Sequence, residues 1–475
     1  MTWNSHFIFM RACAMTRINE IQTKRRGERE KRMETKKKYG LFTAICMIVG
    51  IVIGSGIFFK SDNVLVATDG NVVLGIIVFV LAASAIVFGS LTIAELAMRS
   101  DGAGGIIVYA EKYVNERTAR IFGWVQNFVY YPTITVVVSW VIGIYGCILF
   151  GIEATLELQI MIGFAVFTVL CIMNYLSAKM AGYFQNASTI IKIIPLFIVA
   201  IVGLIFGDPN FSVVEHTAAA SQGVGWIAAV GPIAFSYDGW IIATNVSHEI
   251  KNEKKNLPKA LVIAPVFILI IYVCYFLGIS LMVGPEQIMQ LGDAHVDVAF
   301  SSFMGPLGSK VLLVFVVISI MGTVNGLILG GSRGMYALGL KGMIPKSKTF
   351  AKIDQKRDMP CYGLILFYAF CAIWMVIHYL TMKFSLLNNS DVSEISIVTM
   401  YLLYLVLYIQ VIRLKRQGVI KSVWKGYIIP ILAMVGSLFV FVGGMQNPMF
   451  LAYVGFSAGV ALIAGFYKGK KGIKS

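Results

Sequence analysis

Long hydrophobic blocks, separated by short polar segments, dominate this chain of 475 residues. Each block is long enough to cross a hydrocarbon layer of about 30 Å as an α-helix. A transmembrane barrel would instead show alternating segments of about ten residues, and the sequence lacks that pattern. We therefore predict an all-α membrane protein. Its twelve transmembrane helices are expected at residues 41–59, 72–97, 121–150, 159–176, 187–207, 226–247, 259–283, 311–332, 361–380, 393–412, 427–444 and 449–467.

The composition agrees with a protein embedded in a membrane, since 58% of the residues are hydrophobic and 13% are charged. The seven cysteines lie almost entirely inside the hydrophobic blocks, without paired spacing and without the Cys/His clusters that zinc requires. The five histidines are scattered over the tail, the outer loops and the helix ends. We therefore expect no disulfide framework, no metal, no cofactor and no enzymatic activity.

The net charge of +16 could indicate a nucleic-acid-binding protein, so the distribution of the charges matters. Of the 40 Lys and Arg residues, 37 fall in the N-terminal tail and on the same side of the predicted helices as that tail. The opposite side holds Lys60, Lys310 and Lys383. This asymmetry follows the positive-inside rule and predicts that both termini are cytoplasmic. The expected partner of the basic side is thus the lipid bilayer and not nucleic acid.

Two of the predicted helices are interrupted near their midpoints. The first contains Gly-Ser-Gly at residues 54–56, and the sixth contains Ser-Tyr-Asp-Gly at residues 236–239. Backbone polar groups in lipid must be satisfied internally, so such clusters indicate helix breaks that face a cavity. Close helix packing is the competing interpretation, because membrane helices use glycine for that purpose too.

The two breaks occupy equivalent places if residues 226–412 repeat the five helices of residues 41–207. Because five is odd, the second repeat would have inverted topology. Residues 427–467 would add two helices, and residues 1–40 and 468–475 would form cytoplasmic tails. Corresponding broken helices in inverted repeats point to the substrate site of a transporter.

The chemistry of such a pair of breaks favours a zwitterionic ligand. The half-helix that begins after Gly54 exposes unpaired amides and a positive dipole end, which suit a carboxylate. Carbonyl groups in the unwound segments suit an ammonium group. Glycine at positions 54 and 56 lets the backbone unwind and approach the ligand closely. An α-amino acid carries both of these charged groups.

Several motifs resemble those of the amino acid-polyamine-organocation (APC) superfamily. Residues 54–58, Gly-Ser-Gly-Ile-Phe, look like its first-helix signature. Residues 235–240, together with the Glu-Ile-Lys-Asn of 249–252 and the Asn-Leu-Pro-Lys-Ala of 256–260, are similar to its L-type amino-acid transporter branch. The Tyr-Asp-Gly-Trp-Ile form is especially like bacterial serine/threonine exchangers. The likeness covers residues 41–467.

The resemblance implies a LeuT-like fold of ten core helices, sodium-independent amino-acid transport and alternating access around a midplane site. The amides near Ser55 to Ile57 would hold the substrate carboxylate, and carbonyls from both breaks would hold the amine. Phe235 looks like the aromatic gate above the substrate. The implied substrate site comprises Ile51, Ile53, Gly54, Ser55, Gly56, Ile57, Phe235, Ser236, Tyr237 and Asp238.

Two departures from the family pattern concern the substrate and the partner. Leu327 stands where the serine/threonine exchangers carry a lysine after Asn-Gly, so the substrate range is expected to be serine/threonine-like or broader. Mammalian L-type relatives join a heavy chain through a cysteine in the loop between helices 3 and 4. Here Cys147 falls inside the predicted third helix, so no disulfide-linked heavy chain is expected.

Lys192 is the most unusual charged residue, because it lies in the fifth predicted helix. Burying an ammonium group in the membrane is costly, which makes such a lysine a functional candidate. By resemblance it stands where sodium-coupled relatives bind their cation, and it would replace that charge. The alternative is that Lys192 snorkels to the cytoplasmic headgroups from near the helix end.

Asp238 has several possible roles. It could pair with a substrate amine or a basic side chain, carry a coupling proton, or cap the second half of the broken helix. Tyr131, Asn325 and Tyr404 could line the pocket, although helix packing explains them equally well.

Three further charged residues lie at predicted cytoplasmic helix ends: Glu95, Glu249 and Arg333. They could form salt bridges of an inner gate, but solvated helix ends are the favoured interpretation.

These features predict a sodium-independent exchanger of neutral L-amino acids in a bacterial plasma membrane. Three alternatives stay open: a proton-coupled symporter in which Asp238 or Lys192 titrates, a transporter of cationic amino acids or polyamines with Asp238 as counter-charge, and an amino-acid sensor without flux. An ion channel is disfavoured because the sequence shows no filter or pore ring.

Overall fold

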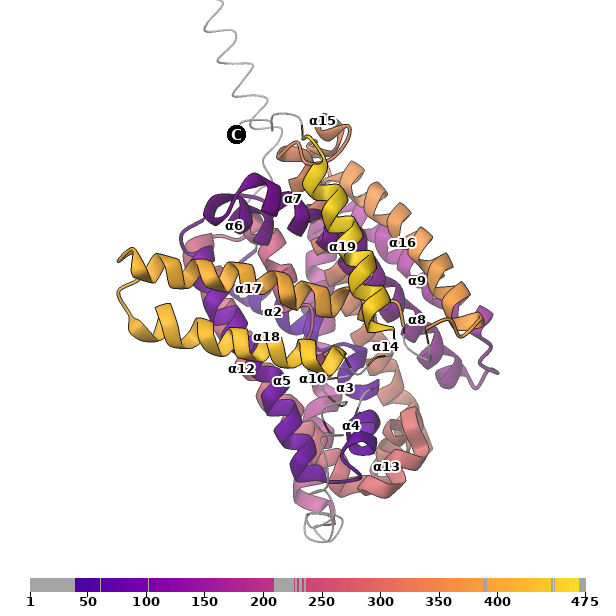
Figure 1. The fold of residues 1–475 in the computed structure, drawn as a ribbon. Coiled ribbons are helices and arrows are strands. Elements are labelled where there is room, and N and C mark those ends of the chain that lie inside the picture. Colours follow the sequence, from indigo (N-terminus) through magenta and orange to yellow (C-terminus); the bar gives the residue numbers. More distant parts are fainter. Residues whose placement is uncertain are drawn as a thin grey trace, which may run out of the picture.

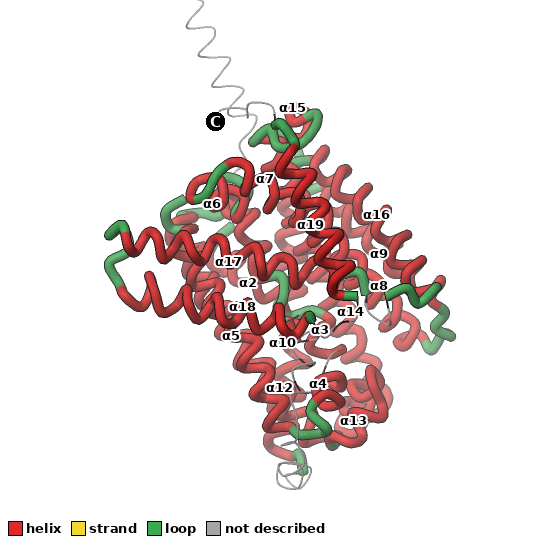
Figure 2. The backbone as a smooth tube through the Cα atoms, viewed as in Figure 1, coloured by secondary structure: helices red, strands yellow, loops and turns green. Residues whose placement is uncertain are grey.

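The computed structural model describes residues 39–59, 61–100, 102–208, 226, 229, 233–234, 236–387, 391–445, 447 and 449–469. This part of the chain is helical apart from turns, loops and two isolated bridges (Figures 1 and 2). Residues 1–38 of the predicted N-terminal tail, most of the C-terminal tail and the gate residue Phe235 lie outside the described residues, whereas Tyr39 is buried against Glu249 and Lys251.

The longer elements follow the hydrophobic blocks of the sequence. In chain order they are α2 (Leu41–Val52), α5 (Val72–Ala97), α7 (Glu116–Trp124), η1 (Val125–Tyr130), α8 (Tyr131–Phe150), α9 (Leu156–Leu176), α10 (Ala178–Phe206), η5 (Trp240–Glu249), α12 (Glu253–Val283), α14 (His295–Leu340), α16 (Cys361–Lys383), α17 (Glu394–Arg416), η7 (Trp424–Ile428), α18 (Ile429–Gly444) and α19 (Phe450–Phe466).

Short helices connect these elements. They are α3 (Ser55–Phe59), α4 (Ser61–Ala67), α6 (Ile106–Tyr113), α13 (Pro285–Leu291), η6 (Gly292–Ala294) and α15 (Ser347–Phe350).

Within the described residues, nine helices are long and apolar enough to cross a membrane, and α2 and α19 are shorter apolar helices. All-helical architecture with several such helices confirms the predicted class of multi-pass membrane protein. The number of spans and the repeat between the two halves stay predictions.

Helix ends follow local capping rules. The side chain of Asn71 accepts a hydrogen bond from the Leu74 amide at 2.9 Å, and Thr155 and Ser177 cap α9 and α10 in the same way. Gly151 ends α8 in the left-handed conformation with φ 63°.

The core of the bundle surrounds the first broken helix. Helix α2 packs against α10, α12, α14 and η5, and α14 also packs against α8, α9 and α16. Helices α17 and α18 lie side by side across the outside of α5 (Figure 1). Helix α19 covers α7 and α17.

The predicted break in the first helix is present. Helix α2 ends at Val52, Ile53 has an extended ψ of 92°, and α3 begins at Ser55. The backbone of Ile53 and Gly54 therefore leaves the helical path in the middle of the hydrophobic block.

A second interruption lies at the other predicted place. Residues 237–239 form a turn, and Gly239 adopts φ 95°, a conformation in which a Cβ would be strained. The chain continues as the 3₁₀-helix η5, which is unusually long for this helix type.

Helix α10 begins at Ala178, nine residues before the predicted start at residue 187. Ser177 caps the helix, so a polar amphipathic stretch extends it beyond the hydrophobic block. Lys192 thus lies 14 residues into α10, about 21 Å from its start at 1.5 Å per residue. The alternative of snorkelling to the headgroups is wrong, because the Lys192 side chain is completely buried and its ammonium group bonds the carbonyls of Gly50 and Ile53.

Candidate functional site

The two helix breaks contact each other directly. A Cβ added to Gly56 would lie 2.6 Å from the Cα of Ser236, so only glycine fits between the two backbones. On the neighbouring side, a Cβ on Gly239 would lie 2.6 Å from Cγ2 of Ile51. The tertiary structure therefore brings together the segments that the sequence singled out, although they lie about 180 residues apart.

A small cavity lies where the breaks meet. It has a volume of about 20 Å³, enough for roughly one water molecule and too small for an amino acid. Ligand entry therefore requires the surrounding elements to separate. The cavity is lined by Ile51, Val52, Gly54, Gly56, Ile134, Val138, Asp238, Gly239, Thr323 and Leu327.

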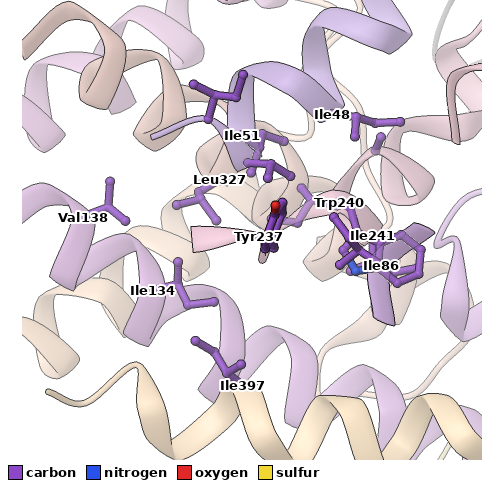
Figure 3. Close-up of a cluster of buried hydrophobic side chains, with 14 of the residues drawn as sticks. Ile48, Ile51, Ile86, Ile134, Val138, Tyr237, Trp240, Ile241, Leu327 and Ile397 are labelled. Carbon is purple, nitrogen blue, oxygen red and sulfur yellow. The ribbon is translucent and has the colours of Figure 1, made fainter. Parts of the chain in front are cut away.

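Most of the side chains that line this cavity are apolar, and several belong to the buried hydrophobic cluster of Figure 3. Figure 3 shows Ile51, Ile134, Val138, Tyr237 and Leu327 converging from α2, α8, the second break and α14. Tyr237 is fully buried and its ring centroid lies 5.0 Å from that of Tyr272. The walls thus favour apolar contact with a ligand, and polar recognition falls to the two breaks.

Lys192 binds the end of α2. Its Nζ donates to the carbonyl of Gly50 at 2.6 Å, to Thr323 Oγ1 at 3.1 Å and to the carbonyl of Ile53. These bonds use all three donors of the ammonium group, which is completely buried. A single positive charge therefore links α10 and α14 to the first break by contacts with oxygen atoms alone.

Tyr272 of α12 connects the two breaks, a role that the sequence did not indicate. Its hydroxyl lies 3.0 Å from the carbonyl of Val52 and 3.0 Å from that of Ser236. The single hydroxyl proton serves one carbonyl at a time. Tyrosine is common in hydrophobic blocks, so the sequence alone does not distinguish this bridging tyrosine from one that only packs in the core.

Tyr272→Phe is expected to lower substrate uptake about 2- to 10-fold, because it removes one hydrogen bond worth about 0.5–1.5 kcal/mol between the breaks. Uptake into liposomes holding the purified protein measures the effect. Tyr275→Phe is the matched control: Tyr275 is buried on the same helix, and its hydroxyl has no hydrogen-bond partner among the described residues. Equal uptake by the two variants would contradict a bridging role for Tyr272.

Asp238 lines the cavity and accepts a hydrogen bond from Tyr130. The Tyr130 hydroxyl lies 2.7 Å from Oδ2 of Asp238, whereas Oδ1 is buried and has no hydrogen-bond partner among the described residues. Gly239 is the N-cap residue of η5, and no side chain caps that helix. The geometry therefore favours pairing with Tyr130 over helix capping.

Other predicted site residues lie in or beside the cavity to different extents. The carbonyl of Ile53 accepts a hydrogen bond from Lys192 and also lies 3.4 Å from Thr323 Oγ1, so it is already engaged within the protein. Ile57 is buried at the start of α3, and for Ser55 only the backbone position is described.

The three possible pocket residues lie outside the lining of this cavity. Tyr131 accepts a hydrogen bond from Asn245 at 2.8 Å, and Tyr404 packs edge-on against Trp240 with centroids 5.7 Å apart. Asn325 donates to Gln185 at 2.9 Å and accepts from Asn174 at 2.8 Å. The amide of Asn325 thus joins α14 to α9 and α10, away from the cavity. Leu327, two residues further along α14, lines the cavity instead.

The charged helix ends form buried contacts. Arg333 Nε donates to Glu249 Oε1 at 2.9 Å, and both side chains are completely buried. The solvated interpretation is therefore wrong for this pair, because the end of η5 packs under α14. Glu95 is also largely buried, with Arg99 at 2.8 Å and Lys425 at 3.5 Å.

Arg333→Met is expected to destabilise the protein by about 3–5 kcal/mol, because it removes the guanidinium that pairs with the buried Glu249 carboxylate. The melting temperature of the purified protein in detergent measures the loss of stability. Lys383→Met is the control, because it breaks an ion pair with Glu157 at the surface. The side chains of Lys383 and Glu157 are 46% and 52% exposed, so the free energy of unfolding should change by less than about 1 kcal/mol. Similar melting temperatures for both variants would argue against a buried ion pair.

A comparison with known protein families identifies the family of this chain. The family model described as amino acid permease matches residues 39–464, nearly the whole chain. The chain belongs to the amino acid permease family. This match confirms the resemblance to the APC superfamily that the motifs of both helix breaks indicated.

Named relatives of this permease fall in the same branch. It is 28% identical over 411 residues to a serine/threonine exchanger of Bacillus subtilis. The aligned region covers 85% of this chain and 90% of the relative. It is 26% identical over 442 residues to the mouse b(0,+)-type amino acid transporter 1, covering 89% and 87%. The human cystine/glutamate transporter is 26% identical over 341 residues, covering 70% and 66%.

Proposed function

We propose that this permease exchanges neutral L-amino acids across a bacterial plasma membrane, without sodium and by alternating access. The observation that carries the proposal is the meeting of two helix breaks at one cavity, with Gly54 and Gly56 on one side and Asp238 and Gly239 on the other. Unwound backbone offers amides to a carboxylate and carbonyls to an ammonium group. The exchanger of Bacillus subtilis and the other transporters among its relatives support the same conclusion.

The proposed architecture has twelve transmembrane helices, with residues 41–207 and 226–412 as inverted repeats and 427–467 as two added helices. Both termini are cytoplasmic in this proposal, as the distribution of Lys and Arg indicates. The substrate carboxylate binds the amides at Ser55 to Ile57. The amine binds carbonyls of both breaks, and Phe235 closes over the substrate.

Lys192 explains independence from sodium in this proposal. Its ammonium group is held by two carbonyls and one hydroxyl, the oxygen ligands that a bound cation would also use. A covalently attached charge at this place removes the need for a coupled ion. Exchange then follows if the empty protein changes conformation slowly and the loaded protein changes it readily.

The permease is proposed to act without a disulfide-linked heavy chain. Cys147 lies within α8 and is completely buried, so its thiol is shielded from a partner cysteine. The partners are thus the substrate and the surrounding lipid.

Transport of cationic amino acids is the second candidate function. The observation that favours it is the unpartnered Oδ1 of Asp238 at the cavity, which could bind a basic substrate group. Asp238→Asn removes the charge but keeps an oxygen for Tyr130. For an exchanger of neutral substrates, labelled L-serine uptake should fall less than about tenfold. Loss of competition by L-arginine in Asp238→Asn would instead establish the cationic function.

Counterflow tests the proposed exchange. Purified protein is placed in liposomes that are preloaded with one unlabelled amino acid at a time, and uptake of labelled L-serine is followed in sodium-free buffer without a pH gradient. Uptake that depends on internal amino acid supports exchange. Equal uptake into empty liposomes that rises only with an inward proton gradient identifies symport, and binding without any flux identifies a sensor.

A further inference from the structure

A second cavity, with none of the wall residues of the first, lies where α7 and η1 meet α16 and α19. Its volume is about 440 Å³, within the range of ligand pockets in proteins. The wall residues come from α7 with η1, from residues 344–350, which include α15, from α16 and from α19. In Figure 1, α7, α15 and the end of α19 lie together at one edge of the bundle. The wall residues are Trp124, Phe128, Ile344, Pro345, Lys346, Phe350, Leu366, Phe370, Val460 and Ile463.

The interior of this cavity is suited to hydrocarbon. Lys346 is the one charged residue in its wall, and every other wall residue is apolar or aromatic. The indole N–H of Trp124 is already used, because it donates to the carbonyl of Met343 at 2.8 Å. Phe128 packs against Trp124 and Phe370 with centroids 5.3 and 4.7 Å away. A polar ligand would therefore find no hydrogen-bond donor deep in the cavity.

One basic residue lines this cavity, and two others lie next to residues that pack against its wall. Lys346 is exposed in the wall, and Lys468 follows Tyr467, whose ring centroid lies 5.4 Å from that of Trp124. The Arg117 guanidinium stacks on Phe466 of α19 at 5.4 Å. Since Arg120 is paired with Glu116 at 2.8 Å, the other three cations give the edge a net positive charge.

The cavity also opens toward the surface that faces lipid. Ile463 in its wall is 62% exposed, and Leu462 and Phe466 beside it on α19 are likewise exposed. An apolar surface of this kind is stable when hydrocarbon chains cover it. A basic pocket between transmembrane helices on the cytoplasmic side is a recognised form of site for acidic lipids.

We propose that this cavity binds an acyl chain of an anionic glycerophospholipid, with the lipid phosphate held by Lys346 at the basic edge. The combination of an apolar interior and a cationic rim matches a molecule that carries hydrocarbon and negative charge side by side. The bound chain packs against Phe128 of η1, two residues before Tyr130. The lipid therefore stabilises the segment that carries the Asp238 partner, independently of which substrate the permease transports.

Native mass spectrometry of the delipidated full-length protein tests this site, with phosphatidylglycerol and phosphatidylcholine of identical acyl chains as probes. Phosphatidylglycerol is expected to bind at least about 5-fold more tightly. Lys346→Glu should abolish this preference, whereas Lys421→Glu should keep it. Lys421 is an exposed lysine on the predicted cytoplasmic side of the protein and lies outside the cavity.

Filling the cavity provides the second arm of the test. Val460→Trp is expected to lower retention of phosphatidylglycerol at least about 5-fold, and Val460→Phe, a smaller intrusion, should lower it in the same direction. Ile431→Trp, on the exposed face of α18, is the control. Equal binding of the two lipids by the unmodified protein, or unchanged binding by both Val460 variants, would overturn the proposal. Folding is checked in each variant by its elution as a single species.

Discussion

Lys192→Ala is expected to reduce amino-acid exchange at least about 100-fold. The substitution removes three hydrogen bonds from a charged group and leaves the carbonyls of Gly50 and Ile53 buried without that donor. Each unsatisfied buried group costs about 1–3 kcal/mol, and 1.4 kcal/mol corresponds to a factor of ten. The end of α2 would lose its charged link to α10 and keep only hydroxyl contacts from Thr189 and Thr323, so the first break would be held less firmly in the geometry that binds substrate. Uptake into liposomes preloaded with amino acid measures the loss.

Lys179→Ala is the matched control, because Lys179 lies on the same helix but is exposed. It should exchange at the rate of the unmodified protein. Lys192→Arg should also be strongly impaired, since the longer guanidinium has no space at a completely buried position. Normal exchange by Lys192→Ala would show that this ammonium group is dispensable.

Gly56→Ala is expected to lower exchange about 10- to 100-fold. The new methyl group would lie 2.6 Å from the Cα of Ser236, far inside the 3.5–4.0 Å at which carbon atoms make favourable contact. A backbone atom cannot rotate away, so one of the two breaks must shift, and overpacking typically costs about 1–3 kcal/mol. The shift would separate the two sets of backbone groups that meet at the cavity.

Gly455→Ala separates this effect from the general consequences of adding a methyl group. Gly455 lies in α19 and has no atom of the protein within 4 Å of the added Cβ. Its replacement should leave exchange unchanged and slightly favour the helix, since alanine has the higher helix propensity. If both variants retain full exchange, close approach of the two breaks is not required for transport.

Glu249 and Arg333 illustrate why charges at helix ends are hard to interpret from sequence. Polar residues at the end of a hydrophobic block are usually solvated, which is why the sequence favours that interpretation here. Burial depends on which other segments cover the helix end. Here the backbone of Tyr39 pairs with Glu249 and Lys251 at 3.1 and 2.8 Å, and α14 covers the remaining side. The same limitation applies to Lys192, whose burial depends on the packing of α10 against α2 and α14.

The sequence by itself determined the helical class, the membrane environment, the approximate helix positions and the locations of both breaks. These properties follow from the length of hydrophobic blocks and from the local preferences of glycine and capping residues, which act over a few neighbouring positions. The motifs around residues 54–58 and 235–240 also identified the family.

Only the tertiary structure decided which distant groups meet. The bonds of Lys192 to Gly50 and Thr323, the bridge from Tyr272 to both breaks, and the turn of Asn325 away from the cavity all depend on helix packing. Local sequence cannot specify such contacts, because a helix presents a different residue every 100° and its neighbours select the face that becomes buried.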